Sequence, residues 1–355
     1  MKTFAPASSQ PAKHIFPSPF RDSKNSPATP LFSLAARNER GILLKRSVLL
    51  VAIVAALGWL LCGGAQAQNS IGSQDVAMSF GTSPGATTPS SPSAPPVDKR
   101  QFTLFKPTPE ANLRDINAFY NGPYTVDAGH LQTETVTALY AYDHNTEAGA
   151  DVKTSFLSFG STTFRLGLLN NLDLGVTFAP HVQLRTVDLV TGVTKNQSGI
   201  GDLTLRSKLN FWGDDSGSTA FGLVAFLKVP TSPVGLGNGD FEGGIGLPLS
   251  VELPKGWWLG VTPEFHIDHD MIGSGYHLDF ASTLFLWHQI AGNLSGYVES
   301  SNFINTKDGT PWISTVDVGI TYVWGKHVQF DAGAFIGVTP AANDISPFLG
   351  ISFRF

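Results

Sequence analysis

Residues 257–268 read WWLGVTPEFHID, and polar and apolar character alternates along them. One face would carry Trp257, Leu259, Val261, Pro263, Phe265 and Ile267, and the other Trp258, Gly260, Thr262, Glu264, His266 and Asp268. Successive side chains of a β-strand point to opposite faces of the sheet. The stretch therefore predicts a strand with one apolar face and one largely polar face.

The same period of two recurs as far as the C-terminus. It predicts twelve strands, near 130–142, 153–168, 172–185, 200–212, 219–229, 242–253, 257–268, 276–287, 292–300, 312–323, 327–337 and 347–355. The apolar face carries no Asp, Glu, Lys or Arg in ten of them. The first and ninth strands are ambiguous, and we orient them by placing Glu134 and Glu299 on the polar face.

The predicted connections alternate between short and long. Short turns fall at 170–171, 213–218, 254–256, 288–291 and 324–326, and longer loops at 143–152, 186–199, 230–241, 269–275, 301–311 and 338–346. This sorting by end is typical of an outer-membrane barrel with both termini in the periplasm. Five of the six tryptophans after residue 67 lie at the short-turn end, where an interfacial aromatic girdle is expected.

These patterns predict an all-β fold, a transmembrane antiparallel up-and-down β-barrel of about 12 strands that ends on Phe355. The alternative is a soluble β-sandwich or lipocalin-like barrel, whose apolar faces would point inward. A soluble domain would not need its turn lengths sorted by end, so the membrane barrel is favoured. Only 14% of the residues are charged, against about 25% in a typical soluble domain.

The segment before the barrel divides into three parts. Residues 1–67 contain a basic region, an apolar run from Val48 to Cys62 and an Ala-Gln-Ala site, which predicts a signal peptide cleaved after Ala67. A short membrane anchor is the alternative reading of that apolar run. Residues 68–100 are rich in Ser and Pro and predict a disordered linker, and residues 101–129 predict a pre-barrel segment or plug. The barrel would span 130–355.

Charge argues against a nucleic-acid partner. Residues 1–67 hold eight basic and two acidic residues, whereas the remainder holds 15 basic and 26 acidic residues. Cleavage would discard the basic part, leaving a body with a net charge of −11 that would repel phosphates.

The polar faces predict an unevenly charged lumen. A basic arc on the second to fifth strands would contain Arg165, Arg185, Arg206, Lys208 and Lys228, together with Asp173 and Asp202. An acidic arc on the sixth to eleventh strands would contain Glu252, Glu264, Asp268, Asp279, Glu299, Asp317 and Asp331. Opposed arcs would set up a transverse field across an open constriction, or would pair and close the lumen. The sequence leaves both alternatives open.

Other chemistry finds little support. His266, Asp268, His269, Asp270 and His277 are metal-ligand types near the long-loop end, but their spacing fits no metal motif, so we predict no metal and no cofactor. Catalysis by an outward Ser–His pair is disfavoured, because the strand histidines, including His181, fall on the polar face. We therefore predict that the chain is not an enzyme.

Three segments resemble one known family. They are Asn121-Gly-Pro-Tyr-Thr-Val-Asp-Ala-Gly-His130, Gly199-Ile-Gly-Asp-Leu-Thr-Leu-Arg-Ser-Lys-Leu-Asn210, and the ending from Asp331 through Pro340 and Asp344 to Phe355. They are similar to Gram-negative outer-membrane transporters of the phenol-degradation meta-pathway (MetA-pathway), over roughly residues 105–355. The resemblance implies passage of aromatic or other small hydrophobic compounds, and it implies no catalytic or ligand residues.

The expected function is therefore that of an outer-membrane channel through which small molecules, including aromatic ones, cross passively. The alternative is a non-conducting structural or interaction barrel. The expected partners are outer-membrane lipid, a small-molecule solute, and the barrel-assembly machinery through the C-terminal strand.

Overall fold

The computed structural model describes residues 101–109, 121–146, 149–214, 217–233, 235–237, 239–270, 275–307 and 310–355. These form one antiparallel sheet and a 3-10 turn, η4 (Pro254–Gly256). The strands are β1 (Leu131–Asn145), β2 (Val152–Leu169), β3 (Leu172–Phe178), β4 (His181–Asp188), β5 (Thr194–Gly199), β6 (Leu203–Trp212), β7 (Thr219–Val229), β8 (Glu242–Gly246), β9 (Leu249–Leu253), β10 (Trp257–His269), β11 (Tyr276–Ala291), β12 (Leu294–Asn305), β13 (Ile313–Trp324), β14 (Val328–Gly337) and β15 (Ile345–Arg354).

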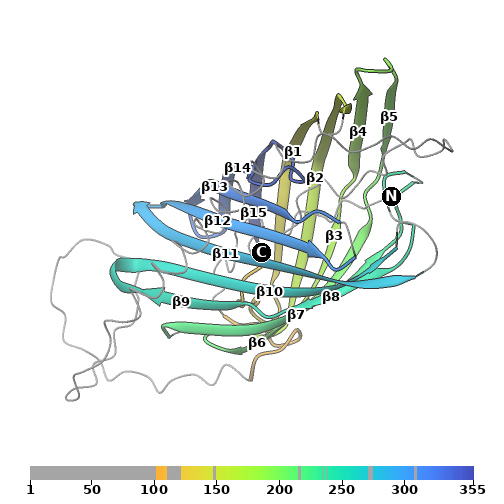
Figure 1. Cartoon of the computed structure of the whole chain (residues 1–355). Coiled ribbons are helices and arrows are strands. Elements are labelled where there is room, and N and C mark those ends of the chain that lie inside the picture. The colour runs from red at the N-terminus through yellow and green to blue at the C-terminus, as the bar shows by residue number, and fades with distance from the viewer. Residues whose placement is uncertain are drawn as a thin grey trace, which may run out of the picture. The chain divides into compact units, whose positions relative to one another are not determined.

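The sheet closes on itself. Strand β1 pairs with β2 on one side and with β15 on the other, so the path of neighbours returns to its start. At this seam Leu131 and Phe355 exchange two backbone hydrogen bonds, at 3.3 and 2.8 Å between N and O. Closure satisfies the edge groups that an open sheet would leave unpaired. The predicted antiparallel barrel is confirmed (Figure 1).

Two of the twelve strand positions around the barrel are each occupied by two shorter strands, separated by a segment that contains a proline. Strands β3 and β4 follow one another with a break at Pro180, and β8 and β9 are separated by Leu247 and Pro248. Proline cannot donate a ladder hydrogen bond, so each break marks a place where the strand bends. Strand β5 pairs with β4 but with no further strand, and Figure 1 shows these two strands extending as a hairpin beyond their neighbours. This hairpin occupies part of the predicted loop 186–199.

The break at Pro180 reverses which side chains of β4 face inward. Val182 and Leu184 are buried, whereas Arg185 and His181 are exposed. The sequence placed Arg185 and His181 on the inward face, and the structure differs. A glycine with φ of 67°, Gly160, produces the matching change of face in β2 beside Pro180. A one-residue shift of this kind moves every following side chain to the other face.

The outward face carries a band of exposed apolar side chains. Its members come from nearly every strand and include Phe164, Leu174, Val176, Leu205, Leu227, Ile245, Phe265, Val298, Ile304, Val318, Ile320, Phe330, Ile336 and Leu349. Trp212, Trp257 and Trp324 are exposed at the short-turn end, whereas Trp287 packs on an interior cluster. The described residues contain no helix long and apolar enough to cross a membrane.

Candidate functional site: the barrel interior

Residues Asn121–Ala128, which we call the inner segment, lie inside the barrel near the short-turn end. Its backbone donates to three polar side chains that follow or begin strands: Thr125 N to Asp214 Oδ1 at 2.9 Å, Val126 N to Asp173 Oδ2 at 2.9 Å, and Ala128 N to Asn170 Oδ1 at 2.9 Å. The hydroxyl of Thr125 also lies 2.6 Å from Asn170 O and 2.9 Å from Asp214 Oδ2. These contacts replace the solvent that an isolated extended segment would bind.

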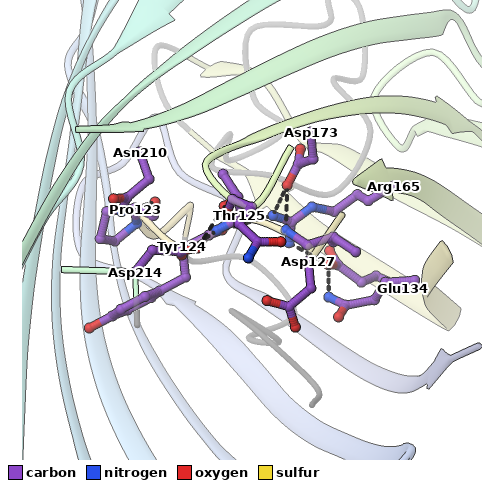
Figure 2. A network of polar contacts seen from close by, with 12 residues as sticks. Pro123, Tyr124, Thr125, Asp127, Glu134, Arg165, Asp173, Asn210 and Asp214 are labelled. Carbon is purple, nitrogen blue, oxygen red and sulfur yellow. Dashed lines mark hydrogen bonds and ion pairs between the residues drawn. The ribbon is translucent and has the colours of Figure 1, made fainter. Parts of the chain in front are cut away.

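The carbonyl groups of the inner segment face the walls on either side. Asn210 Nδ2 donates to Pro123 O at 2.9 Å, and Arg165 Nη2 donates to Tyr124 O at 2.9 Å. The hydroxyl of Thr262, on β10, donates to Asn121 O at 3.2 Å. The inner segment therefore runs between β10 and β2, and Figure 2 shows the wall side chains converging on it.

Asp127 ties the inner segment to the barrel seam. Its Oδ2 lies 2.7 Å from Nη2 of Arg354 on β15, and the side chains of Asp127 and Arg354 are 2% and 0% exposed. Gly167 on β2 makes the approach possible, since a Cβ there would lie 2.0 Å from the carbonyl oxygen of Asp127. A glycine is required where another backbone comes this close.

Arg165 on β2 and Lys228 on β7 have acidic partners close by. Arg165 contacts Asp173 at 2.6 Å and Glu134 at 2.9 Å, and Lys228 forms an ion pair with Glu242. The guanidinium of Arg206 lies over the ring of Phe226, 6.0 Å from its centroid. Buried ions need such partners, because desolvation without pairing is costly. Asp202 instead accepts the backbone N–H groups of Thr231 and Ser232 in the loop after β7.

The opposite wall, on β12 to β14, combines carboxyl groups. Glu299 and Asp317 are cross-strand partners and are 2% and 1% exposed. The hydroxyl of Ser301 lies 2.8 Å from Glu299 Oε1 and 3.1 Å from Asp317 Oδ2. Asp331 accepts from Gln329 at 2.7 Å. None of the ion pairs among the described residues involves these three carboxyl groups.

Aromatic rings lie against this wall over inward-facing glycines. A Cβ on Gly319 would come within 2.4 Å of Cζ of Tyr297, and one on Gly333 within 2.8 Å of Cζ of Phe348. Gly319 and Gly333 are themselves cross-strand partners. Phe285 stands 5.4 Å from Tyr297 and Phe335 stands 5.5 Å from Phe348, between ring centroids. Because Gly319 and Gly333 have no side chain, the rings can lie against the wall beside Glu299 and Asp317.

Two long loops contribute apolar side chains to the interior at the other end. Leu236 packs with a buried cluster that includes Phe156 and Leu184. Ala342 packs with Ala281, Phe303 and Ile313. The interior is thus bounded by the inner segment toward the short turns and by these loop residues toward the long loops.

A polar cluster lies at the long-loop rim. Asp270 accepts from His277 Nδ1 at 2.7 Å and pairs with Lys307, while Asn305 contacts both His277 and Asp279. The hydrogen bonds from Lys307 and then His277 lower the pKa of Asp270 below its ordinary value of 3.8. Within the described ranges no three His, Cys, Asp or Glu side chains form a group that could hold a metal ion.

Comparison with known proteins identifies the family. The family described as "Putative MetA-pathway of phenol degradation" matches residues 115–355. The chain belongs to this family. Comparison with curated proteins found no match.

Solved structures similar to this family member include an outer membrane channel and two autotransporter domains. An outer membrane channel from Pseudomonas putida F1 is 14% identical, with a TM-score of 0.46 over 69% of this chain and 100% of that one. The transport unit of the autotransporter AIDA-I from Escherichia coli is 12% identical, with a TM-score of 0.41 over 68% and 93%. The translocator domain of the autotransporter NalP from Neisseria meningitidis is 11% identical, with a TM-score of 0.38 over 64% and 87%.

The structure sorts the predicted lumen residues of this family member into three groups. Nine are buried: Arg165, Asp202, Lys208, Lys228, Glu264, Asp279, Glu299, Asp317 and Asp331. Arg206, Glu252 and Asp268 are partly exposed, and Arg185 is exposed. Sequence reasoning missed Asn170, Asp214 and Gly167, which hold the inner segment. Nothing in their local sequence distinguishes them from ordinary turn residues.

Proposed function

We propose that the chain is an outer-membrane channel through which small molecules, including aromatic ones, cross passively. The inner segment closes the channel toward the short turns and moves aside for passage. The exposed apolar band supports a place in lipid, because closure pairs the first strand of the barrel with the last and so satisfies their edges. The inward rings of Phe285, Tyr297, Phe335 and Phe348 support aromatic solutes, which they would contact face or edge.

One observation carries this proposal: wall side chains, and not strand pairing, hold the inner segment. Its contacts run to Asp173, Asp214, Asn170, Asn210 and Arg165. A typical hydrogen bond contributes about 1 kcal/mol net, and water can replace each partner once the segment moves. The segment can therefore leave while the barrel's own ladder stays intact.

Two glycine substitutions test the proposal in planar lipid bilayers. Gly167→Ala places a Cβ 2.0 Å from the Asp127 carbonyl oxygen and should displace the inner segment, which raises conductance. Gly175→Ala is the matched control, because that inward-facing glycine has its nearest neighbours at an ordinary 3.5 Å. We expect the current of Gly175→Ala to equal that of the unmodified chain. Equal, negligible currents from all three proteins would contradict a channel.

A non-conducting structural or interaction barrel is the second candidate. The buried ion pair between Asp127 and Arg354 favours it, because such a pair holds the inner segment strongly in place. Negligible current from Gly167→Ala, in a preparation whose inner segment has become accessible to protease, would select this candidate over the channel.

We further propose the path by which the chain reaches the outer membrane. Residues 1–67 would act as a signal peptide cleaved after Ala67, and residues 68–100 as a linker; both ranges lie outside the described residues. The last strand, ending at Phe355, would be recognised by the barrel-assembly machinery. Amino-terminal sequencing of protein from isolated outer membranes should begin at Gln68, and a different first residue would refute the cleavage site.

A further inference from the structure

The wall formed by β11 to β14 holds a carboxyl pair between two aromatic side chains at one level. Phe285, Glu299, Asp317 and Phe335 are successive cross-strand partners on four adjacent strands. The rings of Tyr297 and Phe348 lie one step closer to the short turns, over Gly319 and Gly333. We call Glu299, Asp317, Phe285, Tyr297, Phe335 and Phe348 the acidic–aromatic wall.

The carboxyl pair lacks the ion pairing that the basic residues of the interior show. Arg165, Lys228 and Arg354 each contact a carboxylate, whereas neither Glu299 nor Asp317 belongs to an ion pair among the described residues. Oδ1 of Asp317 has no hydrogen-bond partner within the same residues, although the side chain is 1% exposed. A buried carboxylate without a cationic partner costs several kcal/mol, so a bound cation or a shared proton must offset it.

We propose that the acidic–aromatic wall binds an organic cation, an ammonium group carried on an aromatic or apolar body. The ammonium would donate to Asp317 Oδ1 and to Glu299. The apolar body would contact the rings of Phe285, Tyr297 and Phe335. Aromatic faces attract cations, and the attraction is strongest where water is excluded. This inference deepens the proposed function. It rests on that function only for the passage of the cation through the barrel, because binding at the wall requires no transport.

Three ligands of nearly the same shape separate charge from aromatic character. Benzylammonium, benzyl alcohol and benzoate carry one positive, no and one negative charge on the same ring. Isothermal titration calorimetry of the folded full chain in detergent should show benzylammonium binding about tenfold or more tightly than benzyl alcohol. Benzoate should not bind. Equal or tighter binding of benzyl alcohol would overturn the proposal and indicate a shared proton on the pair.

Variants locate the site. Glu299→Gln with Asp317→Asn should abolish the preference for benzylammonium, and Asp188→Asn, on the exposed β4–β5 hairpin, should leave it unchanged. Tyr297→Phe keeps a ring and should retain binding, whereas Tyr297→Leu should weaken it several-fold. Retained preference in the double variant would overturn the proposal. If the double variant fails to fold, Glu299→Gln alone should weaken the preference for benzylammonium over benzyl alcohol. An unchanged ranking of the three ligands in Glu299→Gln would then overturn the proposal.

Binding and conductance separate this inference from the function on which it rests. Benzylammonium binding without any bilayer current would leave the wall as a binding site and refute the channel. Current without a preference for benzylammonium would keep the channel and refute the cation site.

Discussion

Replacing Asp127 by asparagine should release the inner segment from the barrel. Asp127→Asn keeps the shape of the side chain but removes the charge that meets Arg354 at 2.7 Å, where both side chains are almost fully buried. Removing one partner of a buried pair costs about 3–5 kcal/mol, because the remaining charge stays desolvated after its counterion is lost. Moving the segment aside would let water reach Arg354 and relieve this cost.

The shift in population follows from that free energy. Each 1.4 kcal/mol changes an equilibrium about tenfold, so about 3–5 kcal/mol raises the ratio of released to bound segment by roughly two to four powers of ten. Single-channel recording measures the ratio directly as the fraction of time spent in the conducting state. The unmodified chain should be mostly closed, and Asp127→Asn should conduct far more often.

A second variant controls for general destabilisation. Asp127→Asn combined with Arg354→Gln removes both charges, and much of the cost should disappear, so that the conducting fraction falls back toward that of the unmodified chain. Asp188→Asn, at a partly exposed carboxylate on the β4–β5 hairpin, should have no effect. An unchanged conducting fraction in Asp127→Asn, with the chain folded, would refute the role of the inner segment.

Three further predictions follow from the interior and its rim. Gly319→Ala places a Cβ 2.4 Å from Cζ of Tyr297, so the ring should swing into the lumen and the conductance of the Gly167→Ala channel should fall; an unchanged conductance would place the ring outside the path. Arg206→Glu should shift the reversal potential in a salt gradient toward cation selectivity, and no shift would show that Arg206 lies outside the conducting path. The pKa of Asp270, measured by NMR titration, should lie below 3.8 and rise in Lys307→Met. Because the folded-state pKa is lowered, the stabilisation from this contact is present above pH 3.8 and is lost as the pH falls through the folded-state pKa. A pKa at or above 3.8 would contradict the contact.

The barrel itself was predictable from alternation. Strand β10 (Trp257–His269) shows why: lipid or solvent on one side and the interior on the other force a period of two on the sequence. Glu299, placed on the polar face of an ambiguous strand, is buried at 2% beside Asp317. Closure of the barrel could be predicted from the even number of strands and from the alternation of short turns with long loops. Both can be recognised from local sequence.

Changes of the inward face along a strand and contacts between distant residues were harder to predict from the sequence. The sequence places Arg185 on the wrong face because Gly160 and Pro180 shift the alternation by one residue. The alternation on either side of the shift is intact and gives no sign of it. The contacts of Thr125 with Asp214 span 89 positions, and a turn aspartate gives no local sign of such a partner. The aromatic rings over Gly319 and Gly333 depend on cross-strand register, which only pairing defines.

The most direct test of the account fixes the inner segment to the wall. Thr125 and Asp214 lie 2.9 Å apart between Oγ1 and Oδ2, and residues 68–355 contain no cysteine, so Thr125→Cys with Asp214→Cys offers a unique pair for a disulfide. The account predicts that the oxidised protein, in a Gly167→Ala background, carries no current and that reduction restores the current. The same current before and after reduction would contradict the claim that the inner segment closes the channel.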